Sequence, residues 1–325
     1  MSETTESQTP VGDTSAAPGV TPDAPRVSVI IPHLNTPDVL AVCLTSVAGQ
    51  HLDHGHAEII VVDNGSKVSM DQVKADFPAV RFLLEPQPGP GLARNRGIAA
   101  ARASVLVFID ADCRAEAGWL QAAVDAVEAD PERAVIGGDV RIDVRDESRL
   151  TDIEAYEAVF GFRQQLYIEK KNFSGAGNLA IAAHIHGRVG PFCGIEKAED
   201  LDWGLRAHAA GYPPRYVPAM RIYHPARPDF AALQRKWERH IGHEFHDHKA
   251  AGRPMLIWHA RAAAMIASIP VDGVRLITSD RLSGVGNRLK GLAVLARIRI
   301  YRAAEMLRLA GQRGDASKVD SWNRQ

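Results

Sequence analysis

The stretch Val105–Asp112, VLVFIDAD, is an apolar run that ends in two carboxylates one residue apart. Five or six consecutive apolar residues are typical of a strand buried on both faces inside a parallel sheet. Open α/β sheets bind their ligands at the carboxyl ends of such strands. Two close carboxylates repel each other unless a cation lies between them, and Mg²⁺ or Mn²⁺ carrying a diphosphate suits such a site. A strand followed by an acidic turn would also account for this sequence, because Asp favours turns.

Apolar segments alternate with candidate helices on both sides of this strand. We expect strands over 27–32, 58–62, 80–84, 105–109 and 134–138, and helices over 37–50, 69–77, 91–103 and 119–129. Farther along we expect a long helix over 152–170, strand and turn over 172–182, a helix over 199–210, a strand over 216–223, and helices from 228 onward. The regular alternation predicts a doubly wound, largely parallel sheet.

Composition places the chain among globular enzymes. Of its 325 residues, 46% are hydrophobic and 24% charged, and the net charge of −1 argues against a nucleic-acid partner. Residues 1–26 are rich in Ser, Thr, Pro and acid, which predicts a disordered tail. We therefore expect an α/β domain over 27–227 and a helical C-terminal extension over 228–325.

The cysteines and the lengths of the apolar runs indicate in which cellular compartment the protein functions. The three cysteines are widely spaced and form no CxxC pair, which indicates a reducing compartment rather than a disulfide framework. The N-terminus lacks a signal-peptide layout, and no uncharged apolar run reaches the ~18–20 residues that a membrane span requires. We expect a cytoplasmic protein.

The C-terminal segment is basic. Residues 281–325 contain ten Lys and Arg against three acidic residues, which suggests contact with an anionic surface. Over 289–309 the arginines fall on two sides of a helix, among Leu, Ile and Val. Peripheral contact with the cytoplasmic face of a membrane and packing against the α/β domain both agree with this pattern.

Four segments stand at or just beyond the ends of predicted strands. They are SVIIPHLN (Ser28–Asn35), VVDNGS (Val61–Ser66), GLARNRGI (Gly91–Ile98) and the DAD motif. In this order, and with EDLDWGLRAHAAGY (Glu199–Tyr212), they resemble the family 2 glycosyltransferases over about residues 27–225. The resemblance implies a Rossmann-like α/β GT-A fold, which binds nucleotide-diphospho-sugars, over the 27–227 domain.

The resemblance assigns a donor site. Pro32 and Asn35 match the loop that lines the nucleotide pocket in the family. Asp63 matches the acid that binds the base or ribose, usually of a uridine nucleotide, although an Asp here suits a turn cap equally well. Arg94 and Asn95 match a pair near the base and diphosphate, whereas by themselves they suit a solvated helix face.

The DAD motif matches the family's DXD. This makes Asp112 a ligand of a divalent metal, Mn²⁺ or Mg²⁺, and makes Asp110 a contact to ribose or metal. His224 matches a late histidine near the metal or diphosphate, and it also suits an ordinary core or loop role. The metal would neutralise the leaving nucleoside diphosphate as a Lewis acid.

A second acidic cluster begins the predicted helix over 199–210. In the family an acid here is the general base, and we favour Asp200 with Glu199 as the second choice. Displacement from the opposite side would invert the anomeric configuration. Negative charge is also common at helix starts for electrostatic reasons. Asp202 lies four residues before Arg206, which predicts a structural ion pair.

FSGAGNLAI (Phe173–Ile181) matches the small-residue turn that faces the sugar and acceptor in the family. Gly175 and Gly177 would allow close backbone approach, and Asn178 would offer its amide to hydroxyl groups. A plain turn accounts for the same letters. Histidines within 240–248 could bind a metal, but a polar helix face is the simpler interpretation.

The sequence therefore predicts an inverting, metal-dependent glycosyltransferase. Its donor would be a nucleotide-diphospho-sugar, in particular a UDP-sugar, and its acceptor a hydroxyl of a glycan, a lipid-linked glycan or another cell-envelope precursor. A sugar-nucleotide nucleotidyltransferase would need a Gly-rich, basic loop after the first strand, which His33–Asp38 lacks. A non-catalytic nucleotide-sugar binding module would not need the full set of acidic residues.

Overall fold

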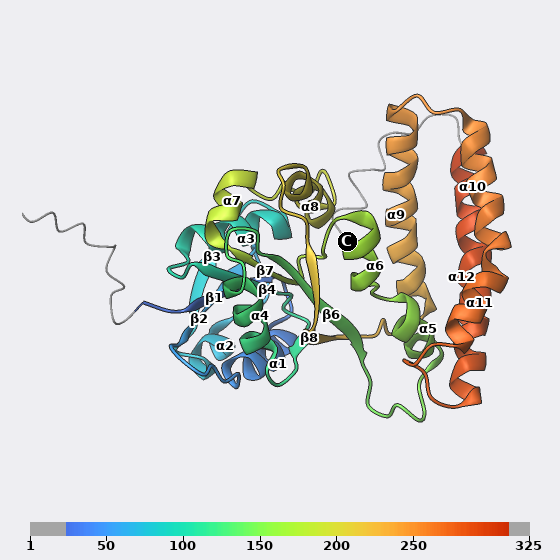
Figure 1. The fold of residues 1–325 in the computed structure, drawn as a ribbon. Coiled ribbons are helices and arrows are strands. Elements are labelled where there is room, and N and C mark those ends of the chain that lie inside the picture. Colours follow the sequence, from blue (N-terminus) through green and yellow to red (C-terminus); the bar gives the residue numbers. More distant parts are fainter. Residues whose placement is uncertain (1–23, 312–325) are drawn as a thin grey trace, which may run out of the picture.

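The computed structural model describes residues 24–311, so most of the tail predicted over 1–26 lies outside the described residues. The described chain forms an α/β part and, beside it, a lobe made only of helices (Figure 1). The last strand of the sheet leads directly into the lobe (Figure 1). The helices α5 and α6, which precede that strand in sequence, also lie on the lobe side.

The α/β part contains one eight-stranded sheet within the described residues, in the order β3-β2-β1-β4-β7-β6-β8-β5. The strands are β1 (Val27–His33), β2 (Ala57–Asp63), β3 (Arg81–Leu84), β4 (Val105–Ile109), β5 (Arg114–Ala115), β6 (Val135–Asp143), β7 (Asn178–Ala182) and β8 (Arg215–Pro225). The helices around this sheet are α1 (Pro37–Ala48), α2 (Asp71–Asp76), α3 (Pro90–Ala100), α4 (Trp119–Glu128), α7 (Ala183–Val189) and α8 (Glu199–Ala209).

The expected parallel arrangement holds for β3, β2, β1 and β4, and for the β6–β8 pair. In contrast, β7 runs antiparallel to both β4 and β6. Its first residue, Asn178, therefore lies opposite Ile109, the last residue of β4. As a result, the glycine turn before β7 reaches the same end of the sheet as the DAD motif.

The lobe consists of α5 (Asp152–Phe160), α9 (Phe230–Ala250), α10 (Met255–Ala267), α11 (Ile269–Ile277) and α12 (Val285–Gly311), whereas α6 (Gln164–Lys171) packs against β6 and β8 of the sheet. The prediction of a single helix over 152–170 is wrong, because the helix is interrupted between α5 and α6. Arg163 has φ −125° and ψ 55°, outside the helical region. The buried Gln164 side chain then accepts a hydrogen bond from Gly175 N at 3.1 Å, which fixes the new direction.

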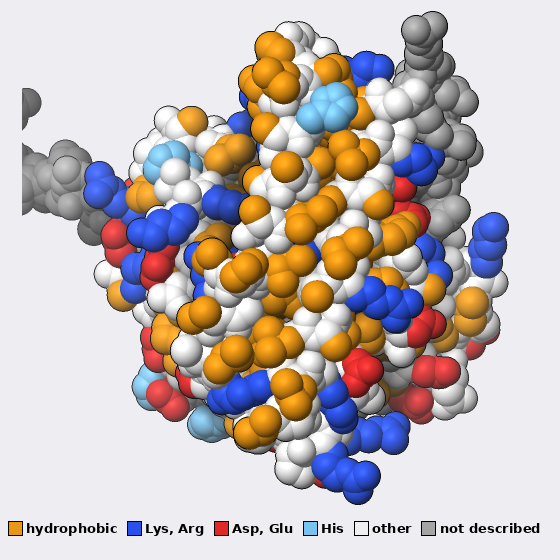
Figure 2. Space-filling model, turned by 90° about the vertical axis from the view of Figure 1, so that its right-hand side faces the viewer, with side chains coloured by type: hydrophobic (Ala, Val, Ile, Leu, Met, Phe, Trp, Pro, Cys, Tyr) orange, Lys and Arg blue, Asp and Glu red, His pale blue; other side chains and the backbone are white. Residues whose placement is uncertain are grey.

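Apolar side chains of α12 hold the lobe together. Leu295 and Ile298 are fully buried against α5 and α11, and Met306 packs with Trp258 of α10. The outward face of the lobe carries many hydrophobic side chains (Figure 2). None of the helices between residues 24 and 311 combines the length and apolar character needed to cross a bilayer.

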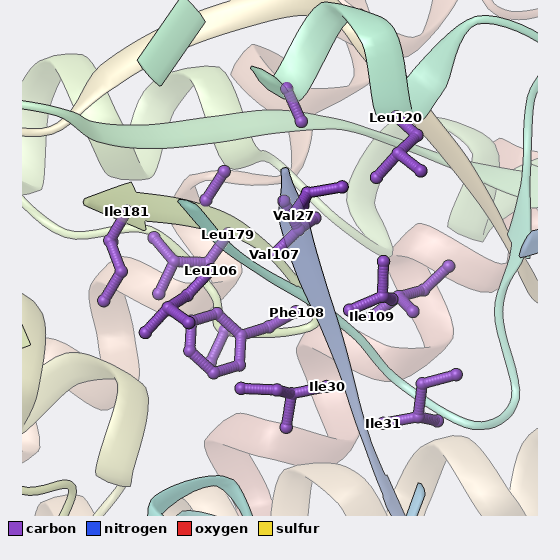
Figure 3. Packing of buried hydrophobic residues seen from close by; sticks show 14 of the residues in the cluster. Val27, Ile30, Ile31, Leu106, Val107, Phe108, Ile109, Leu120, Leu179 and Ile181 are labelled. Carbon is purple, nitrogen blue, oxygen red and sulfur yellow. The ribbon is translucent and has the colours of Figure 1, made fainter. Parts of the chain in front are cut away.

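The core of the α/β part is centred on β1 and β4. Every residue of β4 is buried, and Leu106, Phe108 and Ile109 pack against residues of β1 and β7 (Figure 3). Full burial of each large side chain stabilises the fold by about 1.5–3 kcal/mol. The apolar run that precedes the DAD motif is thus a rigid base for the two carboxylates.

Candidate active site

The two carboxylates that follow β4, Asp110 and Asp112, contact different basic side chains. Asp110 Oδ1 accepts a hydrogen bond from Arg94 Nη2 at 2.7 Å, and Asp112 Oδ2 lies 3.2 Å from His224 Nε2. Both acidic side chains remain accessible, with 40% and 42% of their surface exposed. The separate partners reduce the repulsion between the two acids and leave both open to a ligand.

Arg94 connects the DAD motif to the second acidic cluster. It is only 3% exposed, and its Nη1 donates to Glu199 Oε1 at 2.9 Å while Nη2 donates to Asp110. The helix α3 can lie this close to α8 and to the segment before it because Gly91 has no side chain: a Cβ there would be 3.2 Å from Glu199 Cβ and 2.2 Å from Cys193 O. Arg94 was predicted near the base and diphosphate, and in the structure it bridges Asp110 and Glu199.

Asp200 begins α8 beside this bridge. Its Oδ1 accepts a hydrogen bond from Leu201 N at 2.7 Å. Burial, and next the neighbouring Glu199 carboxylate, raise the pKa of Asp200 to about 6. A carboxylate with a pKa near the working pH is suited to accept a proton. The predicted pair of Asp202 with Arg206 is confirmed, at 2.9 Å.

His224 reaches the site from β8. Its ring packs against that of Phe162, with 4.6 Å between centroids. Burial works against the charged imidazolium, but Asp112 outweighs it and raises the pKa of His224. In return, and despite burial of the carboxyl, His224 lowers the pKa of Asp112. Each member of the pair therefore favours the charged form of the other.

The donor set near Asp112 suits a divalent metal that is shared with a substrate. Between residues 24 and 311 no three His, Cys, Asp or Glu side chains converge on one point. Asp112 and His224 offer two donors 3.2 Å apart. Mg²⁺ is commonly held by one or two carboxylates together with substrate phosphates rather than by a cage of protein ligands. The histidines within 240–248 lie on α9, and among the described residues they form no group of three metal ligands.

The loops after β1 and β2 are tied together. Asn35, with φ +59°, accepts a hydrogen bond from Lys67 N at 2.7 Å, and its own N donates to Ser66 Oγ at 2.8 Å. Asp63 Oδ1 accepts from Ser66 N at 3.0 Å, which is the turn-capping role, and its side chain keeps 23% of its surface exposed. Pro32 is not in the loop: it is a buried residue of β1.

The turn before β7 makes close contact with the DAD motif. A Cβ on Gly177 would be 2.3 Å from Asp110 Oδ2, so only glycine fits without movement. Gly175 instead donates its N–H to Gln164, as described above. The prediction for Asn178 is wrong: it is fully buried, and its amide contacts Trp119 Nε1 and two backbone carbonyls, leaving nothing for a hydroxyl ligand.

Asn95 also differs from its prediction. Its Nδ2 donates to Phe192 O at 2.8 Å and its Oδ1 accepts from Phe192 N at 2.9 Å. Both ends of the amide are therefore used to hold the segment before α8. Asn95 positions that segment, and with it Glu199, rather than contacting a base or a diphosphate.

Two residues near the site have no counterpart among the predictions. Phe162 lies between α5 and α6, and no local sequence pattern predicts its contact with His224. His33 ends β1, with its Nδ1 3.8 Å from Asp63 Oδ1 and its Nε2 accepting from Thr36 N at 3.1 Å. Its position at the end of a buried strand, next to Asn35, was the available signal.

Comparison with known proteins agrees with this architecture. Residues 28–198 match the family model "Glycosyl transferase family 2". The glycosyltransferase AglE of Haloferax volcanii is 30% identical over 67% of this chain and 72% of its own length. The pre-mycofactocin glycosyltransferase of Mycobacterium tuberculosis is 28% identical over 62% of this chain, but the match spans only 43% of that relative.

Among solved structures, the mannosyltransferase PcManGT of Pyrobaculum calidifontis, in complex with GDP-Man and Mn²⁺, shares the fold. The TM-score is 0.52 at 18% identity, covering 94% of this chain and 82% of that one. The family model covers more than half of the 325 residues, and the chain matches AglE over two thirds of its length. The protein therefore belongs to glycosyl transferase family 2 and is a glycosyltransferase with the GT-A fold.

Proposed function

We propose that this enzyme is an inverting glycosyltransferase that uses a nucleotide-diphospho-sugar donor, in particular a UDP-sugar. The acceptor is a hydroxyl of a glycan, a lipid-linked glycan or another cell-envelope precursor, and residues 27–227 form the catalytic domain. The observation that carries this proposal is the Arg94 bridge, which puts Asp110 and Glu199 on one guanidinium. One site can then contain both the donor-binding acids and a base for the acceptor.

On the donor side, Asp112 and His224 would hold a divalent metal, Mn²⁺ or Mg²⁺, with Asp110 beside them. When bound, the metal supplies positive charge to the diphosphate that leaves. The complex of PcManGT with GDP-Man and Mn²⁺ supports this cofactor class and makes GDP-sugars the second donors to test. We place the nucleoside beside Asn35 and the partly exposed Asp63.

On the acceptor side, Asp200 is the general base. Its pKa of about 6 keeps it ionised at neutral pH yet basic enough to take a proton, whereas Glu199 is already engaged by Arg94. The carboxylate accepts the hydroxyl proton as the acceptor oxygen forms a bond to the anomeric carbon. The bond from that carbon to the diphosphate oxygen breaks on the opposite face, the electron pair leaves with the nucleoside diphosphate, and the configuration inverts.

The test is to incubate the protein with UDP-sugars and GDP-sugars plus Mn²⁺ and to measure release of the nucleoside diphosphate. Wild-type protein should release it from at least one donor, and Asp112→Asn and Asp200→Asn should lose that activity. Asp202→Asn is the matched control, because this acid lies in the same helical turn but pairs with Arg206. NMR of the product would report the anomeric configuration.

Each outcome bears on a separate part of the proposal. If the wild type neither binds nor hydrolyses any nucleotide sugar, the donor assignment fails. If Asp200→Asn transfers sugar at the wild-type rate, the base assignment is wrong. A product that retains the configuration of the donor would contradict direct displacement.

A further inference from the structure

Exposed large hydrophobic side chains are concentrated on the last three helices. Ten of the seventeen such side chains in the described chain lie on α10, α11 and α12, among them Leu256 at 79% exposure and Val274 at 61%. Figure 2 views this side of the lobe and shows the hydrophobic side chains as one broad field, with Lys and Arg mainly toward its margins. Monomeric soluble proteins rarely leave such large apolar patches uncovered.

The contribution of α12 is a regular stripe. Val285, Leu289, Ile300 and Leu307 are the exposed large hydrophobic residues of this helix. At about 100° per residue they fall within about 60° of one another around the helix axis. Because the helix has 27 residues, the stripe runs along a rod about 40 Å long. A stripe this long and narrow suits a flat surface better than a small ligand.

Cations line one border of the stripe. Lys290, Arg297 and Arg308 are exposed and lie within about 20° of one another, next to the stripe. The arginines on the opposite side of α12 are used inside the lobe: Arg302 is stacked on Trp237 at 3.5 Å, and Arg299 pairs with Asp272. The two-sided arginine pattern of the sequence thus separates cations packed inside the lobe from exposed ones. The exposed cations also have local contacts: Lys290 donates to Leu150 O, Arg297 lies over the Phe230 ring, and Arg308 pairs with Glu305.

The segment that forms this face has a net positive charge. Residues 255–311 contain nine Lys and Arg against three acidic residues. Two of those acids are already neutralised, because Asp272 pairs with Arg275 and Arg299, and Glu305 pairs with Arg308. A second copy of this chain would bring the same positive charge to the contact, and like charges repel. An anionic surface with an apolar interior complements both properties.

We propose that the outer face of α10, α11 and α12 docks on an anionic phospholipid bilayer. The apolar stripe enters the boundary between headgroups and acyl chains, and the flanking Lys and Arg side chains contact lipid phosphates. Docking goes beyond the proposed glycosyl transfer and does not depend on it. It also assigns the contact to three helices, rather than to the arginines of the C-terminal segment as a whole.

The test is sedimentation of the full chain with vesicles. One set contains equal parts of phosphatidylglycerol and phosphatidylcholine, and the other contains phosphatidylcholine alone. We expect binding to the anionic vesicles that is at least about tenfold tighter than to the neutral ones and that weakens with added salt. The variant Leu256→Ser/Val274→Ser/Leu289→Ser should bind about 100-fold more weakly, because it removes one apolar side chain from each helix.

The matched control is Val42→Ser/Val68→Ser/Leu84→Ser, which alters side chains with 48–59% exposure on the α/β part. This variant should bind vesicles like the wild type. Equal binding by the two triple variants would overturn the inference, as would the absence of wild-type binding to anionic vesicles. If instead the wild type is a dimer in solution and the helical variant a monomer, a second copy covers the face and the bilayer does not. Vesicle binding needs no nucleotide sugar, so its failure is distinct from failure of the proposed function.

Discussion

The Arg94 bridge makes a quantitative prediction about stability. Arg94 is 3% exposed and contacts Asp110 at 2.7 Å and Glu199 at 2.9 Å. In Arg94→Met the apolar chain fills most of the volume, but two carboxylates lose their shared cation. Removing one partner of a buried ion pair typically costs about 3–5 kcal/mol. Since the Asp110 side chain is partly exposed, water offsets some of the loss, and we expect about 3 kcal/mol.

Urea unfolding near neutral pH would measure this loss. Arg96→Met is the matched control: Arg96 is exposed on the same helix, so its substitution should change the free energy of unfolding by no more than about 0.5 kcal/mol. The double variant Arg94→Met/Glu199→Gln should recover at least about 1 kcal/mol, because one of the two unpaired charges is gone. A loss below about 1 kcal/mol in Arg94→Met, or no recovery in the double variant, would refute the role of Arg94 as the bridge.

Four further predictions concern the site. Asp112→Asn should reduce nucleoside diphosphate release by about 10²–10³-fold, since it removes a charge and leaves the shape; calorimetry should show weaker Mn²⁺ binding. In the wild type kcat/KM should rise as pH increases through about 6, where Asp200 loses its proton, and Glu199→Gln should move this limb to lower pH by removing a like charge. Because the pKa of Asp200 is raised in the folded state, its carboxylate destabilises the fold above about pH 6. Asp200→Asn should therefore unfold at higher urea at pH 7.5, with the advantage lost by about pH 4. Gly177→Ala should lower transfer, because its Cβ would be 2.3 Å from the neighbouring carboxylate, whereas Gly187→Ala, with nothing within 4 Å, should leave the rate unchanged.

Short stretches of sequence were sufficient for the elements and the family. The strand at 105–109 could be predicted because a wholly apolar run needs burial on both faces, and β4 is buried throughout. The Asp202–Arg206 pair was predictable because helix geometry alone brings residues i and i+4 together. The DAD motif and its companions identified the family because their order along the chain is itself the signal.

Polar side chains were predicted less well, because their roles depend on what surrounds them after folding. Asn95 and Asn178 have amides that could meet either a ligand or the backbone, and each is used by backbone or core groups. The break in the helix expected over 152–170 depends on Gln164 reaching Gly175, which no local propensity encodes.

The sequence by itself determined the buried strands, the acidic motifs at their ends and the membership of glycosyl transferase family 2. Tertiary structure alone decided that β7 runs antiparallel, that Arg94 spans 105 positions of sequence to reach Glu199, and which cations of α12 face outward. The physical reason is that strand burial and helical periodicity constrain residues that are close in sequence, so they produce a local sequence pattern. The partner of a buried charge is fixed only when distant segments pack. The free-energy cost of burying that charge depends on all the groups that exclude water around it.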